Sequence, residues 1–454
     1  MPTATLERPS LESEIQRSAP IKAVHQRLGW VLILPLLFFA AHGQFSFQFG
    51  TSATGGFAPG PVSAADPGIS GYALAGITYF IVALLIRSKL GGVISFATHF
   101  KMLTFLALLT VGSTVWSQSP LRSALHGIFY LAGTLFAYYL VIRFDPAEIM
   151  ALVKRLGVVC CVLGLITVVL FPRFGLVHND LRSGVGWQGI FIDRTTAAKC
   201  LVFLLSPALI FPIQWRKPSR VLYIVLLSLM IIMAHSVGSI FVLCIYVGFL
   251  VSLRFMRKLD PRACLVVIIL GFAVALPVAI SAYEYGPIIL KAFGRDPTLT
   301  GRTVIWGFLV RSILKRPILG YGYYAFWLGL KGESGRVIYA LNWTFGYAHN
   351  GLLEIFLQLG LTGVAVFFLT LLKAVKDAWF CFRRDRTGHY DWYLGLIVLT
   401  IFYNIDEVTV LLPNDLLSIL YVVACCGLAV AVRQIKQDKL LGVGISNGSS
   451  LPLA

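Results

Sequence analysis

Two residues with the potential for catalysis, a histidine and an arginine, both stand near expected helix starts. His349 directly precedes Asn350, a residue favoured at helix N-caps, and an apolar run follows. A histidine near a helix N-terminus is held toward its neutral form, which can accept a proton. Arg302 stands in the first turn of another expected helix, which Thr300 can cap, and a bound anion would offset the unfavourable helix dipole there. The two residues are therefore candidates for a general base and an anion-binding group.

Each assignment has a structural alternative. A lone histidine is more often structural than catalytic, and Arg302 could instead pair with Asp296 at the surface. Glu354 lies one turn beyond Asn350 and is expected to orient His349 or to pair with an arginine. Its plainer role would be to stabilise the start of its helix.

A second polar group stands at the start of another apolar run. Arg194 and Lys199 follow Asp193 there and could approach the same anion, whereas the alternative is a surface pair of Asp193 with Arg194. The candidate substrate-binding residues are Arg194, Arg182, Lys199, Arg311, Tyr321, Asn350 and Glu354.

Metal and thiol chemistry have little support. His42, His178 and His235 have no partner at metal-ligand spacing, and no Asp-x-Asp triplet occurs. The eight cysteines form no Cys-x-x-Cys motif and nearly all lie in apolar runs, as packing residues do. We therefore expect a site that uses neither a metal ion nor another cofactor.

The composition indicates that membrane helices must position these residues. Hydrophobic residues make up 57% of the 454-residue chain, charged residues only 13%, and the mean hydropathy is +0.81. Each crossing of the hydrocarbon layer needs about 20 mostly apolar residues in a helix. We therefore predict an all-α polytopic membrane protein with about twelve transmembrane helices. The predicted spans are 29–47, 71–87, 101–116, 123–142, 156–172, 195–214, 220–236, 238–253, 263–282, 350–372, 391–409 and 414–432.

The distribution of lysine and arginine predicts the orientation. The formal net charge is +18, and most basic residues fall in the alternate loops that the positive-inside rule assigns to the cytoplasm. The first outer loop, 43–70, has no lysine or arginine, and the last carries Asp406, Glu407 and Asp415. We therefore expect cytoplasmic tails at 1–28 and 433–454 around a transmembrane domain at 29–432. The positive net charge of the chain is then explained by its cytoplasmic loops, and no nucleic-acid partner is expected.

Two outer segments depart from this pattern because they are basic. One is 173–199, and the other is the long loop 283–349 between the ninth and tenth spans, which has a net charge of +5. Val304, Ile305, Phe308 and Leu309 recur at helical spacings within it, so residues 300–317 are predicted to form an amphipathic helix. A basic outer surface at a membrane predicts an anionic ligand such as a lipid phosphate, or else contact with ordinary anionic headgroups.

Three motifs in order resemble those of a known family. They are Gly301-Arg302-x-x-x-Trp306, Pro317-x-x-Gly320-Tyr321-Gly322, and Ala348-His349-Asn350 followed by Gly360 and Gly363. This combination resembles the O-antigen ligase and polymerase superfamily, most closely the bacterial exopolysaccharide polymerases, and by motif it covers residues 187–363.

The resemblance implies a fold of the GT-C type and a metal-independent, inverting glycosyl transfer. The donor would be an undecaprenyl-pyrophosphate-linked oligosaccharide at the outer face of the bacterial inner membrane. By the same resemblance, His349 would be the base and Arg302 a pyrophosphate ligand, with a chain-length regulator and a flippase as partners.

The chain departs from the family at one position. Ligases of the family carry an arginine near the segment that here reads His235-Ser-Val-Gly-Ser239, and this chain has none there. We therefore expect Arg194, or else Arg182, to supply the second cation, and we favour a polymerase over a ligase that transfers glycan to a lipid or protein. A third hypothesis is a flippase or exporter of lipid-linked sugars, which is disfavoured because charged residues gather at the outer face instead of lining many spans.

Overall fold

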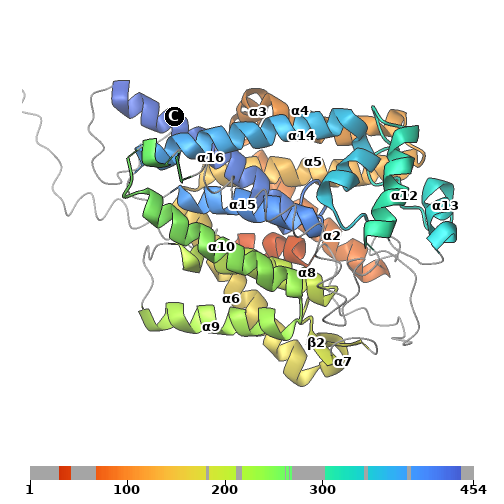
Figure 1. Ribbon diagram of the computed structural model, residues 1–454, viewed down its shortest axis with the longest axis horizontal. Helices are drawn as coiled ribbons and strands as arrows, with labels where there is room; N and C mark the ends of the chain where they lie inside the picture. Colours follow the sequence, from red (N-terminus) through yellow and green to blue (C-terminus); the bar gives the residue numbers. More distant parts are fainter. Residues whose placement is uncertain are drawn as a thin grey trace, which may run out of the picture.

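The structure is a computed structural model that describes residues 30–41, 68–179, 184–210, 217–260, 262–264, 266–267, 302–341, 346–385 and 390–440. It is a bundle of helices with one small β-hairpin (Figure 1). A short helix, Trp30–Ala40, comes first. The elements that follow are α2 (Gly68–Arg87), α3 (Leu90–His99), α4 (Lys101–Gly112), α5 (Pro120–Arg143), α6 (Pro146–Leu170), α7 (Pro172–Gly175), β1 (Leu176–Asn179), β2 (Gly184–Trp187), α8 (Arg194–Leu209), α9 (Lys217–Met233), α10 (Val237–Met256), α12 (Arg302–Lys315), α13 (Gly332–Leu341), α14 (Gly351–Arg384), α15 (Asp391–Asp406) and α16 (Leu416–Leu440).

The helices confirm an all-α membrane protein but not the full count of twelve spans. Within the described residues, five helices are long and apolar enough to cross a membrane, or six when α2 and α3, bent by 87°, count as one broken span. Other expected spans correspond to shorter helices: α4 has 12 residues, α8 16, α9 17 and α15 16. Most of the span expected at 263–282 lies outside the described residues, as does 283–301 of the long loop.

Helix α16 forms the centre of the bundle. Of its most apolar stretch, 83% is buried inside the protein, against 28% for α10. It packs against α5, α14 and α15, whereas α10 leaves Phe241 and Val251 exposed. Apolar side chains on the outside of such a bundle are expected to face lipid.

The segment that follows α12 docks on α14 at a break in that helix. Gly360 has φ +62° inside α14 and interrupts the helix. The freed backbone groups pair with that segment: the Tyr321 N–H donates to the Leu357 carbonyl at 2.8 Å, and the Leu361 N–H donates to the Pro317 carbonyl at 2.7 Å. The second sequence motif therefore fastens the loop after α12 to α14, because polar backbone in a bundle must find partners.

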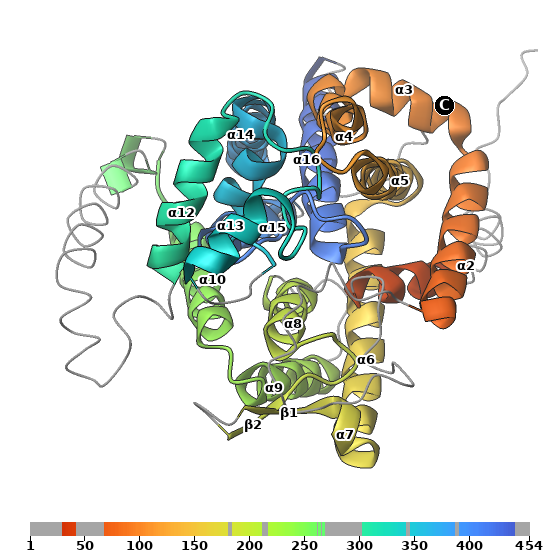
Figure 2. The same ribbon diagram turned by 90° about the vertical axis from the view of Figure 1, so that its right-hand side faces the viewer.

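The two basic segments meet at one end of the bundle, which we call the loop end. It carries the hairpin of β1 and β2, helices α12 and α13, the start of α14 and the loop 407–415 (Figures 1 and 2). The predicted amphipathic helix is confirmed as α12. Its buried stripe is Ile305, Leu309 and Ile313, while Val304 and Leu314 are exposed.

Candidate functional site

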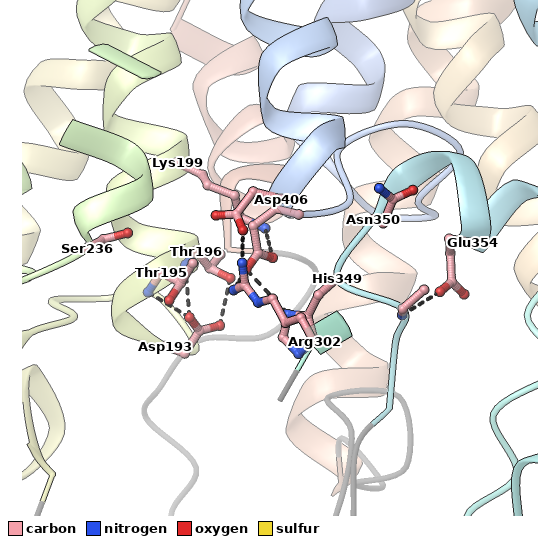
Figure 3. A network of polar contacts seen from close by, with 12 residues as sticks. Asp193, Thr195, Thr196, Lys199, Ser236, Arg302, His349, Asn350, Glu354 and Asp406 are labelled. Carbon is pink, nitrogen blue, oxygen red and sulfur yellow. Dashed lines mark hydrogen bonds and ion pairs between the residues drawn. The ribbon is translucent and has the colours of Figure 1, made fainter. Parts of the chain in front are cut away.

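Glu407 is the meeting point of three segments that are far apart in the sequence. Its side chain follows α15 directly and is 5% exposed. One carboxylate oxygen, Oε2, accepts from Lys199 Nζ of α8 at 3.2 Å. The other, Oε1, lies 3.3 Å from Arg302 Nη2 of α12 and 3.5 Å from His349 Nδ1. Two cations and the candidate base thus surround one carboxylate. Figure 3 shows Lys199, Arg302 and His349 converging at this place.

Arg302 also pairs with Asp406, the last residue of α15. Two carboxylates at the C-terminal end of a helix are disfavoured by its dipole, so the neighbouring cations compensate them. Asp406 lies against the start of α10, where a β-carbon added to Gly238 would come within 2.7 Å of Oδ2. Ligases of the family carry an arginine near the segment that here contains Ser236 and Gly238. This segment therefore borders the site.

The local charges keep Glu407 ionised. Burial by itself would raise its pKa, but the Lys199 ammonium, the contact with His349 and the Arg302 guanidinium outweigh burial and lower the pKa to about 2. Burial and the nearby Glu407 carboxylate raise the pKa of the Tyr347 phenol well above its usual value. The Tyr347 ring lies 4.0 Å from the His349 ring.

The backbone of His349 is held in an uncommon conformation. Its φ is +48°, which costs a residue other than glycine about 1–3 kcal/mol and requires support from the surroundings. The preceding peptide supplies that support: the Trp306 indole donates to the Ala348 carbonyl at 2.9 Å, and the Ala348 N–H donates to Glu354 at 2.8 Å. Helices α12 and α14 therefore set the direction in which His349 leaves the backbone.

Glu354 acts on this backbone rather than on the imidazole. Its side chain is buried, and besides the Ala348 N–H it accepts from the Trp327 indole at 2.9 Å and from the Gln358 amide at 2.7 Å. All three donors are neutral groups. The described contacts of Glu354 therefore do not include the arginine that the sequence suggested as a partner. Orientation of His349, the other expectation, comes indirectly through Ala348.

Asn350 has the capping role predicted for it. Its side chain accepts from the Leu353 N–H at 3.0 Å at the start of α14, and its amide donates to the Ile405 carbonyl at 3.0 Å. The second contact ties the histidine segment to the end of α15, next to Asp406 and Glu407.

Two other candidates, Arg311 and Tyr321, make their described contacts away from this cluster. Arg311 is nine residues beyond Arg302 on α12, about 13 Å along the axis, and stacks over Phe308. Tyr321 is buried, and its hydroxyl donates to the Ser312 carbonyl at 2.8 Å. Tyr321 is thus part of the packing around α12, whereas Arg311 lies exposed on that helix.

Arg194 follows the N-cap of α8, where Asp193 accepts from the Thr195 and Thr196 N–H groups. The Arg194 side chain packs on the hairpin, since a β-carbon added to Gly186 would lie 3.1 Å from its Cδ. Arg182 lies outside the described residues. The roles expected for Arg194 and Arg182 stay predictions, and so does substrate binding by Lys199, which the structure places on Glu407 beside Arg302.

Sequence reasoning missed Asp406 and Glu407 as site residues. They entered only as acidic residues of the last outer loop, in support of the orientation. A usable signal was present, because the chain has only 20 acidic residues and these two stand together at the mouth of an apolar span. Among the described residues, no three histidine, cysteine, aspartate or glutamate side chains are grouped as a metal site requires.

Residues 222–368 match a protein family described as O-antigen ligase. The chain contains an O-antigen ligase domain. This domain includes α12, the histidine segment and the first half of α14, and so it includes Arg302, His349 and Glu354. Lys199 and Glu407 lie outside the matched residues and complete the site from α8 and from the end of α15.

Three relatives of the chain are informative. The exopolysaccharide production protein ExoQ of Rhizobium meliloti is 24% identical over 301 residues, which is 63% of this chain and 66% of the relative. A protein provisionally named a polysaccharide ligase, from Rickettsia prowazekii, is 25% identical over 48% of this chain and 54% of its own. A second protein with that provisional name, from Rickettsia conorii, is 26% identical over 42% of this chain and 45% of its own. The chain thus spans about half to two thirds of the length of these relatives.

Proposed function

We propose that this protein is a glycosyltransferase that polymerises exopolysaccharide repeat units. The donor would be an undecaprenyl-pyrophosphate-linked oligosaccharide, and transfer would occur at the outer face of the bacterial inner membrane. The observation that carries the proposal is the meeting of His349, Arg302 and Lys199 around Glu407 at the loop end of an apolar helix bundle. The O-antigen ligase match and the name of ExoQ support the substrate class.

In the proposed reaction, His349 Nε2 takes the proton of the acceptor hydroxyl. The acceptor oxygen bonds to the anomeric carbon of the donor from the side opposite the pyrophosphate. The bond from that carbon to the pyrophosphate oxygen breaks, and its electron pair leaves with the lipid pyrophosphate. Such a base contributes about 10² to 10⁴ in rate, and guanidinium and ammonium groups stabilise the charge that develops on the leaving group.

Arg302 is the cation that a pyrophosphate can most readily recruit. In the structure it is paired with Asp406, whose side chain is 44% exposed, and ion pairs exposed to this extent contribute about 1 kcal/mol or less. Lys199 and Glu407, by contrast, are only 7% and 5% exposed and form a buried pair. We infer that the donor displaces Asp406 from Arg302, while the pair of Lys199 with Glu407 persists.

The experiment is an assay of purified protein in proteoliposomes with a fluorescent lipid-linked oligosaccharide. We expect a ladder of products longer than one repeat, with the configuration at the transferred anomeric carbon inverted by NMR. His349→Ala should abolish the ladder and leave donor binding, measured separately, unchanged. Movement of donor across the bilayer without any new glycosidic bond would contradict the proposal and favour an exporter.

A ligase is the second candidate, because the matched family is described as O-antigen ligase and two relatives carry a polysaccharide ligase name. It would use the same residues but a different acceptor. A single transfer to an added lipid or protein acceptor, with no ladder from donor alone, would favour the ligase.

A further inference from the structure

The imidazole of His349 lies with one nitrogen inside the protein. Nδ1 is buried, and among the described residues no group meets ordinary hydrogen-bond geometry with it. Glu407 Oε1, at 3.5 Å, is the carboxylate atom it faces. A contact of this length is slightly beyond a hydrogen bond of 2.7–3.2 Å, and catalytic contacts often shorten when the substrate binds.

We propose that Glu407 is a positioning residue for the transfer reaction, holding His349 through Nδ1 so that Nε2 faces the acceptor hydroxyl. The proposal rests on the proposed function, because it assumes that His349 is the base. Nδ1 keeps its proton and donates it toward Glu407, while Nε2 takes the proton of the hydroxyl. The imidazolium that forms is then stabilised by the carboxylate and later releases the Nε2 proton to water.

The carboxylate is suited to this role because it is fixed and ionised. Lys199 holds Oε2 from α8, which leaves Oε1 for Arg302 and His349. These cations also keep the pKa of Glu407 far below neutral pH, so that it accepts at every pH at which the enzyme would work. A carboxylate held on one side by a buried lysine cannot turn away from the histidine without breaking that pair.

The other charges around the imidazole do not replace Glu407. Arg302, which approaches from α12, is a cation and cannot accept a hydrogen bond from the imidazole, and the other two nearby carboxylates have partners of their own. Asp406 pairs with Arg302, and Asp193 caps α8. The groups facing this region are Arg302, Lys199, Asp193, Asp406, Glu407 and Tyr347.

The test is a pH–rate profile of Glu407→Gln. We expect kcat to fall by about 10- to 100-fold, with a smaller change in donor KM. The acid limb of the profile should move to lower pH, because the protonated base loses its carboxylate. Glu407→Asp, which keeps the charge, should retain the wild-type position of that acid limb.

Glu333→Gln is a matched control. Glu333 also accepts from two cations, Lys315 and Arg336, but it does so on α13. The same change of charge should there leave both kcat and the acid limb unchanged.

An equal loss of activity at every pH in Glu407→Gln, or a loss confined to donor KM, would overturn the proposal. If this variant does not fold, the double variant Lys199→Met with Glu407→Gln removes both members of the buried pair. A smaller shift of the acid limb in the same direction is then expected at saturating donor, because a cation is lost together with the carboxylate. Full activity of His349→Ala would instead reject the proposed function, whatever Glu407 does.

Discussion

At the residue scale, a few side chains of the site each make several polar contacts. Arg302 reaches two carboxylates with one planar fork, and Glu407 reaches three positively charged or protonatable groups with two oxygens. Because these residues share partners, the removal of one side chain takes a partner away from the others. Effects of substitutions in this cluster are therefore expected to be non-additive.

The first prediction concerns the shape of the Arg302 side chain. Arg302→Lys should raise the donor KM by at least about 10-fold, because an ammonium cannot form the paired contacts of a guanidinium with carboxylates or pyrophosphate. The measurement is initial rate against donor concentration. Arg336→Lys, which changes an exposed arginine paired with Glu333, is the control and should retain the wild-type KM. Equal KM values for both variants would show that only positive charge matters at Arg302.

At the element scale, the position of His349 depends on how α12 and α14 are joined. The loop 317–322 docks on the break at Gly360, while Trp306 and Glu354 hold the Ala348 peptide from the two helices. A shift of α12 relative to α14 would therefore move the histidine as well as Arg302. The motif that carries Gly320 and Gly322 is thus structural support for the catalytic segments.

The second prediction tests this junction. Gly360→Ala should destabilise the protein by about 2 kcal/mol or more, because the residue has φ +62° and a β-carbon would lie 2.3 Å from the Ile318 carbonyl group. Thermal unfolding in detergent measures the change, and transfer activity should fall with it.

Gly307→Ala on α12 is the control for this substitution. A β-carbon there meets nothing within 4 Å, so the variant should be as stable as the wild type or slightly more stable. A Gly360→Ala protein with an unchanged melting temperature would contradict the docking role.

At the scale of the whole molecule, all described parts of the site lie at the loop end of the bundle (Figure 1). Charge patterning predicts that this end faces the outer side of the membrane and that both ends of the chain face the cytoplasm. A donor with a lipid tail could then reach the site from the bilayer, with its pyrophosphate at the interface.

The third prediction is the sidedness of two exposed positions. In a Cys244→Ser background, which removes the exposed native thiol, Leu330→Cys should react with a membrane-impermeant maleimide in spheroplasts. Lys436→Cys, near the other end of the bundle, should react only after permeabilisation. The opposite pattern would reverse the assigned orientation and place the site in the cytoplasm.

The sequence by itself determined the membrane class, many of the helices and the cap at Asn350. Apolar runs and N-cap residues act over one or two turns, so the helix at 302–315 and the cap at Asn350 were predictable from local pattern. The candidates Arg302, His349 and Lys199 were recognisable by residue type for the same reason, as polar groups at the mouths of apolar runs.

Only the tertiary structure decided which groups meet. Glu407 contacts Lys199, which is 208 positions away in the sequence, and Arg302, which is 105 positions away. Arg302 also pairs with Asp406 at the end of α15, whereas Asp296, the partner that the sequence offered, lies outside the described residues. Such pairings follow from the packing of α8, α12 and α15 at one end of the bundle. No local periodicity encodes that packing, because the direction of a buried polar side chain is set by the partners that can compensate its charge.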